Sequence, residues 1–229
     1  MLGEMIRSLF SGGSVDFGQV ISQILATLFI IFCILPLHEF AHGWAALRLG
    51  DRTAQVSGRL TMNPLASFDP IGALFLLLFG FGWAKPVPID SRYFKNPKRD
   101  TAITAFAGPL SNFLAALAGA IVYYGIMIAA GVLPDFIRIF FQSYVIINVA
   151  LAVFNLLPIP PLDGSKILGA FLSDRTLYNY YRYQNVIVII AFFVLFGGWL
   201  DGPIWFLENL CLGGVDWLAR LPYRLFGLL

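Results

Sequence analysis

The stretch from Val20 to Leu37 is predominantly apolar and contains no charged residue. A helix needs about 20 such residues to cross the hydrocarbon core of a bilayer. The apolar pattern continues as far as Leu49, and Gly50 follows it in the position of a helix C-cap. The sequence therefore predicts a membrane-spanning helix from about Val20 to about Leu49.

Composition extends this conclusion to the whole chain. Of the 229 residues, 59% are hydrophobic and only 12% are charged, and the mean hydropathy is +0.78. A soluble domain carries about 25% charged residues. We therefore predict an all-α polytopic membrane protein in a lipid bilayer, with residues 1–229 forming a single domain. The net charge of +2 is spread through loops, which gives no reason to expect a nucleic-acid partner.

Further apolar runs predict further helices. Residues 101–133 and 136–157 indicate two helices joined by a tight turn at Pro134 and Asp135, and residues 184–200 indicate another span. The run from residue 71 to 83 is short for a span, so we expect a re-entrant or interfacial segment there.

Two weaker patterns complete the expected fold. Polar and apolar residues alternate around Gln55 to Met62, which predicts a small membrane-associated β element. The tail from Pro203 mixes Trp, Tyr and charged residues, which is typical of a helix lying at the membrane interface. The fold then contains about four to six transmembrane or re-entrant helices.

The two histidines of the chain, His38 and His42, stand four residues apart near the end of the first apolar run. On a helix this spacing places both imidazoles on one face, so both can reach one ion. Glu39 lies beside them and can take a proton from a water at that ion. This H-E-x-x-H arrangement is typical of zinc metalloproteases. Ionisable groups at membrane depth are costly and usually functional.

A catalytic zinc site needs a third protein ligand, and the chain has no third histidine. The ligand must then be a carboxylate or a cysteine. The best carboxylate is Asp163, which follows a proline-broken segment and precedes Gly164. Cys33 precedes His38 by five residues, which turns it about 140° away from the histidine face. We therefore interpret Cys33 as a packing residue and expect Asp163 to complete the site.

Two more motifs lie between and around these residues. Asn155 to Gly164 reads N-x-x-P-x-x-x-L-D-G, and Gly108 to Asn112 reads G-x-x-x-N. With the H-E-x-x-H motif, they make the chain resemble the site-2 protease family of intramembrane zinc metalloproteases. The resemblance covers about residues 20–170, the catalytic core of that family. The chain resembles a short form of the family, without the PDZ domain and the nucleotide-binding regulatory domain of larger members.

The resemblance implies one Zn²⁺ per chain and a role for each matching residue. The implied zinc ligands are His38, His42 and Asp163, the general base is Glu39, a candidate oxyanion donor is Asn155, and the substrate path includes Gly108 and Asn112. Simpler readings stay open for three of them. Gly108 and Asn112 also suit plain packing between membrane helices, and Asn155 also suits a bond to free carbonyls at a broken helix end.

The segment from Lys85 to Ile89 contains Pro86 and Pro88, two residues apart. If this segment is extended, one of its edges lacks two N–H donors. The other edge, through Val87, keeps its donors and acceptors. We expect that edge to pair either with the strand near Gln55 or directly with substrate. The alternative is a plain proline-stiffened loop.

Lys and Arg residues predict the orientation in the membrane. Residues 48–100 hold eight of the fifteen and residues 158–182 hold three, eleven in all. The positive-inside rule then places these segments in the cytoplasm, the N-terminus outside, and the active site toward the cytoplasm. We expect a prokaryotic cell membrane and a membrane-protein substrate, and a homo-oligomer stays open.

Two rival functions use the same residues. A metal transporter also places His, Glu and Asp within spans, but it needs ligands at several depths along a path. An inactive relative that binds membrane partners would lack part of the catalytic set. The sequence gathers its histidines in one turn and keeps Glu39 and Asp163, which favours a membrane metalloprotease.

Overall fold

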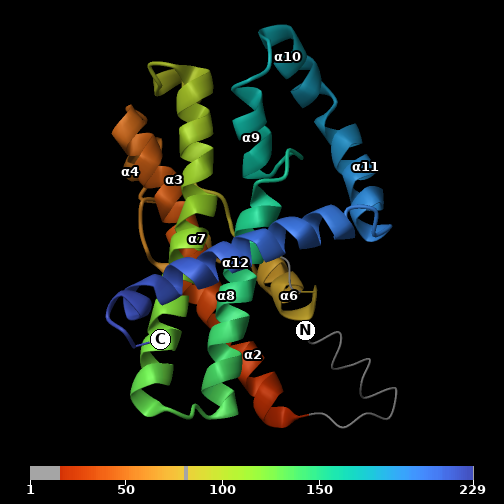
Figure 1. Cartoon of the computed structure of the whole chain (residues 1–229). Helices are drawn as coiled ribbons and strands as arrows, with labels where there is room; N and C mark the ends of the chain where they lie inside the picture. Colours follow the sequence, from red (N-terminus) through yellow and green to blue (C-terminus); the bar gives the residue numbers. More distant parts are fainter. Residues whose placement is uncertain (1–15, 80–81, 229) are drawn as a thin grey trace.

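The computed structural model describes residues 16–79 and 82–228. Among these residues, three helices are long and apolar enough to cross a membrane: Phe17–Leu49, Pro97–Ala130 and Asp135–Asn155. Figure 1 shows them side by side, with the chain running up the first, down the second and up the third. The molecule is thus built around a bundle of three spans, as the long apolar runs predict.

The first span consists of three consecutive segments. These are α2 (Phe17–Phe29), a π-helical turn η1 (Ile30–Ile34) and α3 (Leu35–Leu49). Pro36 lies two residues after the π turn, and its ring cannot occupy a regular helix interior without displacing the preceding turn. Gly50 ends α3 with a φ of 113°, a left-handed conformation that favours glycine, and this confirms the predicted C-cap.

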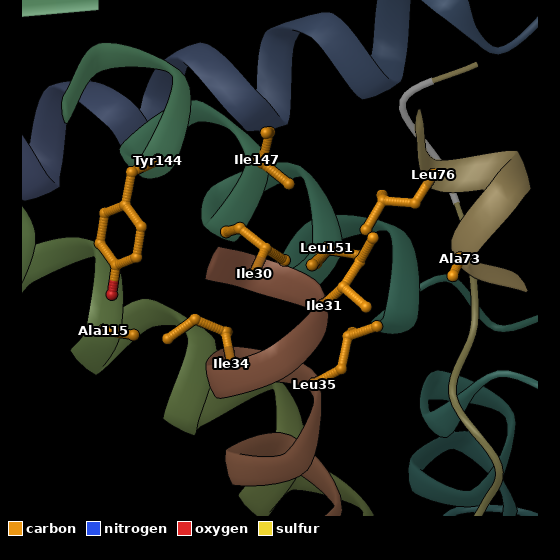
Figure 2. Close-up of a cluster of buried hydrophobic side chains, with 10 residues drawn as sticks. All are labelled: Ile30, Ile31, Ile34, Leu35, Ala73, Leu76, Ala115, Tyr144, Ile147 and Leu151. Atoms are coloured by element: carbon orange, nitrogen blue, oxygen red, sulfur yellow. The ribbon is translucent and has the colours of Figure 1, made fainter. Parts of the chain in front are cut away.

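The second and third spans are α7 (Pro97–Ala130) and α8 (Asp135–Asn155). The predicted turn at Pro134 is present, because α8 begins directly after it. Buried side chains from the first span, α7, α8 and α6 (Pro70–Phe79) meet in one cluster (Figure 2). Its ten buried members are Ile30, Ile31, Ile34, Leu35, Ala73, Leu76, Ala115, Tyr144, Ile147 and Leu151. Through Leu35, this cluster packs the start of α3 against α6, α7 and α8.

The connection between the first span and α7 contains only short helical elements among the described residues. They are α4 (Thr53–Val56), α5 (Pro64–Ser67), α6 and the 3₁₀ turn η2 (Ser91–Tyr93). The β element expected around Gln55–Met62 is wrong, because the described chain there consists of a short helix, a turn and irregular backbone. Asp51 Oδ1 accepts from both N and Oγ1 of Thr53. Such local bonds give the backbone an alternative to strand pairing.

Four helices follow the third span: α9 (Asp163–Gly169), α10 (Asp174–Arg182), α11 (Gln184–Phe196) and α12 (Asp201–Leu225). The expected span at 184–200 is shorter than predicted, because α11 has 13 residues and ends before Gly197 and Gly198. At 1.5 Å per residue it is about 20 Å long, less than the hydrocarbon core. Figure 1 shows α12 lying across α7 and α8, which it contacts.

Candidate metal centre

His38 and His42 lie one turn apart on α3, and their side chains point to the same place. Their Nε2 atoms are 3.0 Å apart. The residues are 6% and 4% exposed, although they are polar and lie in a span. Because burial of an unpaired polar group costs free energy, the surroundings of these two rings must supply partners.

Asp163 is the third member of the group and comes from α9, more than 120 positions later in the chain. Its Oδ2 lies 3.3 Å from Nε2 of His38 and 3.1 Å from Nε2 of His42. The residue is 5% exposed. Gly164 follows it at a point where a Cβ would collide with the carbonyl groups of Leu156 and Leu157. A larger residue than glycine would therefore push Asp163 away from the histidines.

The second carboxylate oxygen of Asp163 has a different partner. Nζ of Lys166 lies 3.2 Å from Oδ1, so one oxygen faces the histidines and the other faces a cation. Burial opposes ionisation of the Asp163 carboxyl, but the imidazoles of His38 and His42 beside its Oδ2 outweigh burial and hold the pKa below its ordinary value. The group is therefore a carboxylate, as a metal ligand must be.

The three donor atoms fit a single divalent ion. Nitrogen or oxygen ligands about 2.0–2.1 Å from a tetrahedral zinc lie about 3.3 Å apart, and the three separations are 3.0, 3.1 and 3.3 Å. Among the described residues, this is the group of buried His, Cys, Asp and Glu side chains that could hold a metal ion. Two imidazoles and one carboxylate leave a fourth position open, which is typical of a catalytic zinc site.

Gly108 on α7 provides the space that such an ion requires. A Cβ built at this position would collide with the Nε2 atoms of both His38 and His42. Those are the atoms that face the candidate ion, so the missing side chain leaves the space in front of them free. The neighbouring Pro109 lies inside α7 and is fully buried, so this part of the helix is packed against α3.

The outer ring nitrogens of both histidines also have partners. Nδ1 of His42 lies 2.7 Å from the carbonyl oxygen of Thr104, and Nδ1 of His38 lies 2.5 Å from Oδ1 of Asn112. Both partners belong to α7. A carbonyl can only accept, so each Nδ1 donates and each Nε2 keeps its lone pair for a metal.

Glu39 lies beside the histidines but points toward the loop after α6. Its Oε2 accepts a 2.7 Å hydrogen bond from the backbone N–H of Val87. In the same loop, the N–H of Lys85 donates to the carbonyl of Ser67, and Nη2 of Arg59 donates to the carbonyls of Lys85 and Pro86. The loop is therefore held from three sides.

A cavity of about 420 Å³ opens in front of these groups. It is bounded by α3, the loop after α6, the end of α8 and the start of α9. Of the residues singled out in the sequence, it is lined by His38, Glu39, His42, Pro86, Val87, Asn155 and Asp163. The lining therefore brings together chemistry-bearing residues from four separate segments.

Three of the singled-out residues do not line this cavity, among them Gly108 on α7, and a fourth, Asn155, is bonded within its own helix. Pro88 and Asn112 are not among the residues lining this cavity, and Asn112 is fully buried behind His38. Asn155 does line it, but its Nδ2 donates to the carbonyl of Leu151 in its own helix. The expected pairing of the Val87 edge with a strand near Gln55 is wrong, since Gln55 lies in α4.

Sequence reasoning missed several residues that contact the site. Lys166 pairs with Asp163, and their i, i+3 spacing on a helix is a usable signal. Asn148 is fully buried in the apolar α8 and bonds Asn112, and an amide within an apolar run is itself a signal. The carbonyl of Thr104 carried no sequence signal, because every residue has this group, and the spacing of the prolines singled out the Val87 edge without indicating Glu39 as its partner. Cys33 is exposed and lies outside the group.

The sequence matches known proteins along most of its length. The model of peptidase family M50 matches residues 26–130 and 125–198. "Putative zinc metalloprotease YwhC" of Bacillus subtilis is 39% identical over 194 residues, covering 81% of this chain and 87% of that protein. "Putative zinc metalloprotease Rip2" of Mycobacterium tuberculosis is 27% identical over 223 residues, covering 92% and 80%. "Stage IV sporulation protein FB" of Bacillus subtilis is 27% identical over 173 residues, covering 73% and 58%. No solved structure matches at a significant level.

Proposed function

This chain belongs to peptidase family M50, and we propose that it hydrolyses peptide bonds in membrane-spanning or membrane-associated segments of other proteins. It is a zinc metalloprotease with helices apolar enough to lie in a membrane. One observation carries the proposal: the buried group of His38, His42 and Asp163 is attached to a span and opens onto a cavity. A substrate would reach this cavity from the bilayer or its boundary.

We assign the zinc ligands to Nε2 of His38, Nε2 of His42 and Oδ2 of Asp163. When bound there, zinc lowers the pKa of a coordinated water and polarises the scissile carbonyl. Glu39 accepts the proton of the attacking water and passes it to the leaving amide nitrogen. Its Oε2 accepts from the N–H of Val87, and the carboxylate keeps its other oxygen, Oε1, as an acceptor for that proton. Lys166 holds the far oxygen of Asp163 in place.

Asn155 is the candidate oxyanion donor, because its side chain lines the cavity. Its amide nitrogen reaches a substrate only after leaving the carbonyl of Leu151. Gly108 and Asn112 were expected along the substrate path. Because Asn112 is fully buried and Gly108 faces the histidines, we assign both to the metal centre instead.

The loop from Lys85 to Ile89 is the proposed substrate-holding segment. Peptide bonds in a membrane helix are shielded by the helix's own hydrogen bonds, so a protease must draw the segment into an extended form. Pro86 and Val87 line the cavity, and Val87 brings an N–H to its edge. A substrate carbonyl that takes this N–H would release Glu39, so binding of an extended substrate and release of the base are one event.

The active site lies toward the cytoplasm in this proposal. The segments with eleven of the fifteen Lys and Arg residues, 48–100 and 158–182, include α4, α9 and α10, which lie at the same end of the bundle in Figure 1. The positive-inside rule assigns that end to the cytoplasm and the N-terminus to the other side. The bacterial origin of the relatives described above supports a prokaryotic cell membrane.

The function is tested by comparing membrane peptides in cells that express the native chain and Glu39→Gln. The variant keeps size and hydrogen bonding but cannot take a proton. Truncated membrane segments should accumulate with the native chain only, and cleavage should fall about 10²–10⁴-fold in the variant. Equal cleavage by both proteins would overturn the proposal. Retention of one zinc per chain by Glu39→Gln excludes misfolding as the cause.

A further inference from the structure

A line of buried amides joins His38 to the backbone of α8. Oδ1 of Asn112 lies against Nδ1 of His38 at 2.5 Å. Nδ2 of Asn112 donates to Oδ1 of Asn148 at 3.4 Å. Nδ2 of Asn148 donates to the carbonyl oxygen of Tyr144 at 2.9 Å. Three helices, α3, α7 and α8, are thereby connected through polar groups that are 0% exposed at both asparagines.

The direction of every bond in this line follows from its last member. The carbonyl of Tyr144 can only accept, so the amide atom of Asn148 that faces it must be Nδ2. Oδ1 of Asn148 then faces Asn112 and requires a donor, which only Nδ2 of Asn112 can supply. Oδ1 of Asn112 is left to face His38. Each amide thus has one orientation that satisfies its neighbours.

We propose that Asn148 is a positioning residue for the metal centre, acting on His38 through Asn112. The line of amides fixes the proton of the His38 imidazole on Nδ1, which leaves the lone pair of Nε2 directed at the ion. This inference rests on the proposed assignment of His38 as a zinc ligand. Asn148 touches neither the ion nor the substrate.

The other histidine provides a comparison within the same site. Nδ1 of His42 lies 2.7 Å from the backbone carbonyl of Thr104, so one direct bond fixes its orientation. For His38, the carbonyl of Tyr144 fixes the same orientation indirectly, through the side chains of Asn148 and Asn112. Because His42 has its own carbonyl, loss of Asn148 should change His38 and leave His42 unaffected.

The position of Asn148 is otherwise suited to an apolar residue. Its neighbours Ile147 and Val149 are buried hydrophobic residues, and α8 is a span by length and composition. A buried amide in such a helix is costly unless its hydrogen bonds are made. An apolar side chain would pack there without that cost, so the hydrogen bonds to Asn112 and Tyr144 account for an amide at this position.

The first test measures zinc affinity by chelator competition on the full chain in detergent. Asn148→Leu and Asn148→Ala should each weaken zinc binding about tenfold, the lower end of the effect of removing outer hydrogen bonds at metal sites. Asn112→Ala should weaken it by about 10- to 100-fold. The double variant Asn112→Ala with Asn148→Ala should bind zinc as Asn112→Ala does, because Asn148 acts only through Asn112. Additive losses would overturn the inference.

A matched control comes from α2. Ser22 is fully buried, and its Oγ donates to the carbonyl of Gly18 in its own helix. Ser22→Ala removes a buried helix-bound polar group far from the site and should leave zinc affinity unchanged. If Ser22→Ala weakens binding as Asn148→Ala does, the effect of Asn148 is a general loss of stability and the inference fails.

The second test observes the imidazoles directly. The chain has two histidines, so a protein labelled with ¹⁵N-histidine and carrying no histidine tag shows only His38 and His42. Without zinc, Nδ1 of both rings of the native chain should keep its proton, because each Nδ1 has an acceptor on α7. In Asn148→Leu, His38 should populate both tautomers and His42 should not change. A single Nδ1-protonated His38 in that variant would overturn the inference and leave the proposed function standing. Full zinc affinity in His38→Ala would overturn the proposed function itself.

Discussion

The backbone N–H of Val87 donates a 2.7 Å hydrogen bond to the carboxylate of Glu39, across 48 positions of the chain. Glu39 comes from α3 and Val87 from the loop after α6, so the proposed base and the proposed substrate edge are in direct contact. The edge that the two prolines leave intact is already occupied by the base. This contact links the geometry of the loop to the chemistry of the site.

We expect Val87→Pro to lower cleavage about 2- to 13-fold, because it removes the N–H that an extended substrate takes from Glu39, a hydrogen bond worth about 0.5–1.5 kcal/mol. Zinc content should stay at one per chain, since Val87 is not a ligand. Val87→Ala keeps the N–H and is the matched control. If Val87→Pro cleaves a helical membrane substrate at the native rate, the loop does not hold substrate by its edge. The alternative of a plain proline-stiffened loop would then stand.

Removal of a zinc ligand should lower metal content and abolish cleavage together. His38→Ala and Asp163→Asn each delete one of the three donor atoms, and two remaining ligands bind zinc far more weakly. Cys33→Ala is the control, because Cys33 is exposed and outside the group. Metal analysis of the purified variants decides the matter: full occupancy in Asp163→Asn with depletion in Cys33→Ala would reverse the ligand assignment.

Gly108→Ala should impair zinc binding although it adds a single methyl group. The new Cβ would collide with the metal-facing nitrogens of His38 and His42, and overpacking of this kind costs about 1–3 kcal/mol. Zinc affinity should fall about 5- to 150-fold. Gly213→Ala on α12 is the matched control, because a Cβ there has no neighbour within 4 Å. Equal zinc affinities of the two variants would contradict the close approach of α7.

Single cysteines should report the orientation in the membrane. In a chain without Cys33 and Cys211, cysteines at positions 55 and 95 should react with an impermeant reagent only from the cytoplasmic side. A cysteine at position 135 should react only from the other side. All three positions are exposed in the described chain, so accessibility depends on the membrane alone. The reverse pattern would place the active site near the opposite face.

Much of the fold was predictable because apolar runs and helix ends are local properties. The three spans, the C-cap at Gly50 and the turn at Pro134 all follow from residues within a few positions of each other. The short helix α4 near Gln55, where a strand was expected, was not predictable in this way. An alternating pattern suits a strand only if a partner strand exists, and the bond from Thr53 to Asp51 instead satisfies the backbone locally.

The H-E-x-x-H pair and its span were determined by the sequence itself, because four residues on a helix span one turn and 20 apolar residues span a bilayer. That Asp163 is the carboxylate facing His38 and His42 was a prediction from its proline-broken surroundings, and its 3.1–3.3 Å approach depends on the packing of α9. The partners of the outer nitrogens and of Glu39 were decided by tertiary structure alone. The two prolines single out the Val87 edge in the sequence, but nearly every residue has a backbone N–H, so only the folded chain determines that this one reaches Glu39.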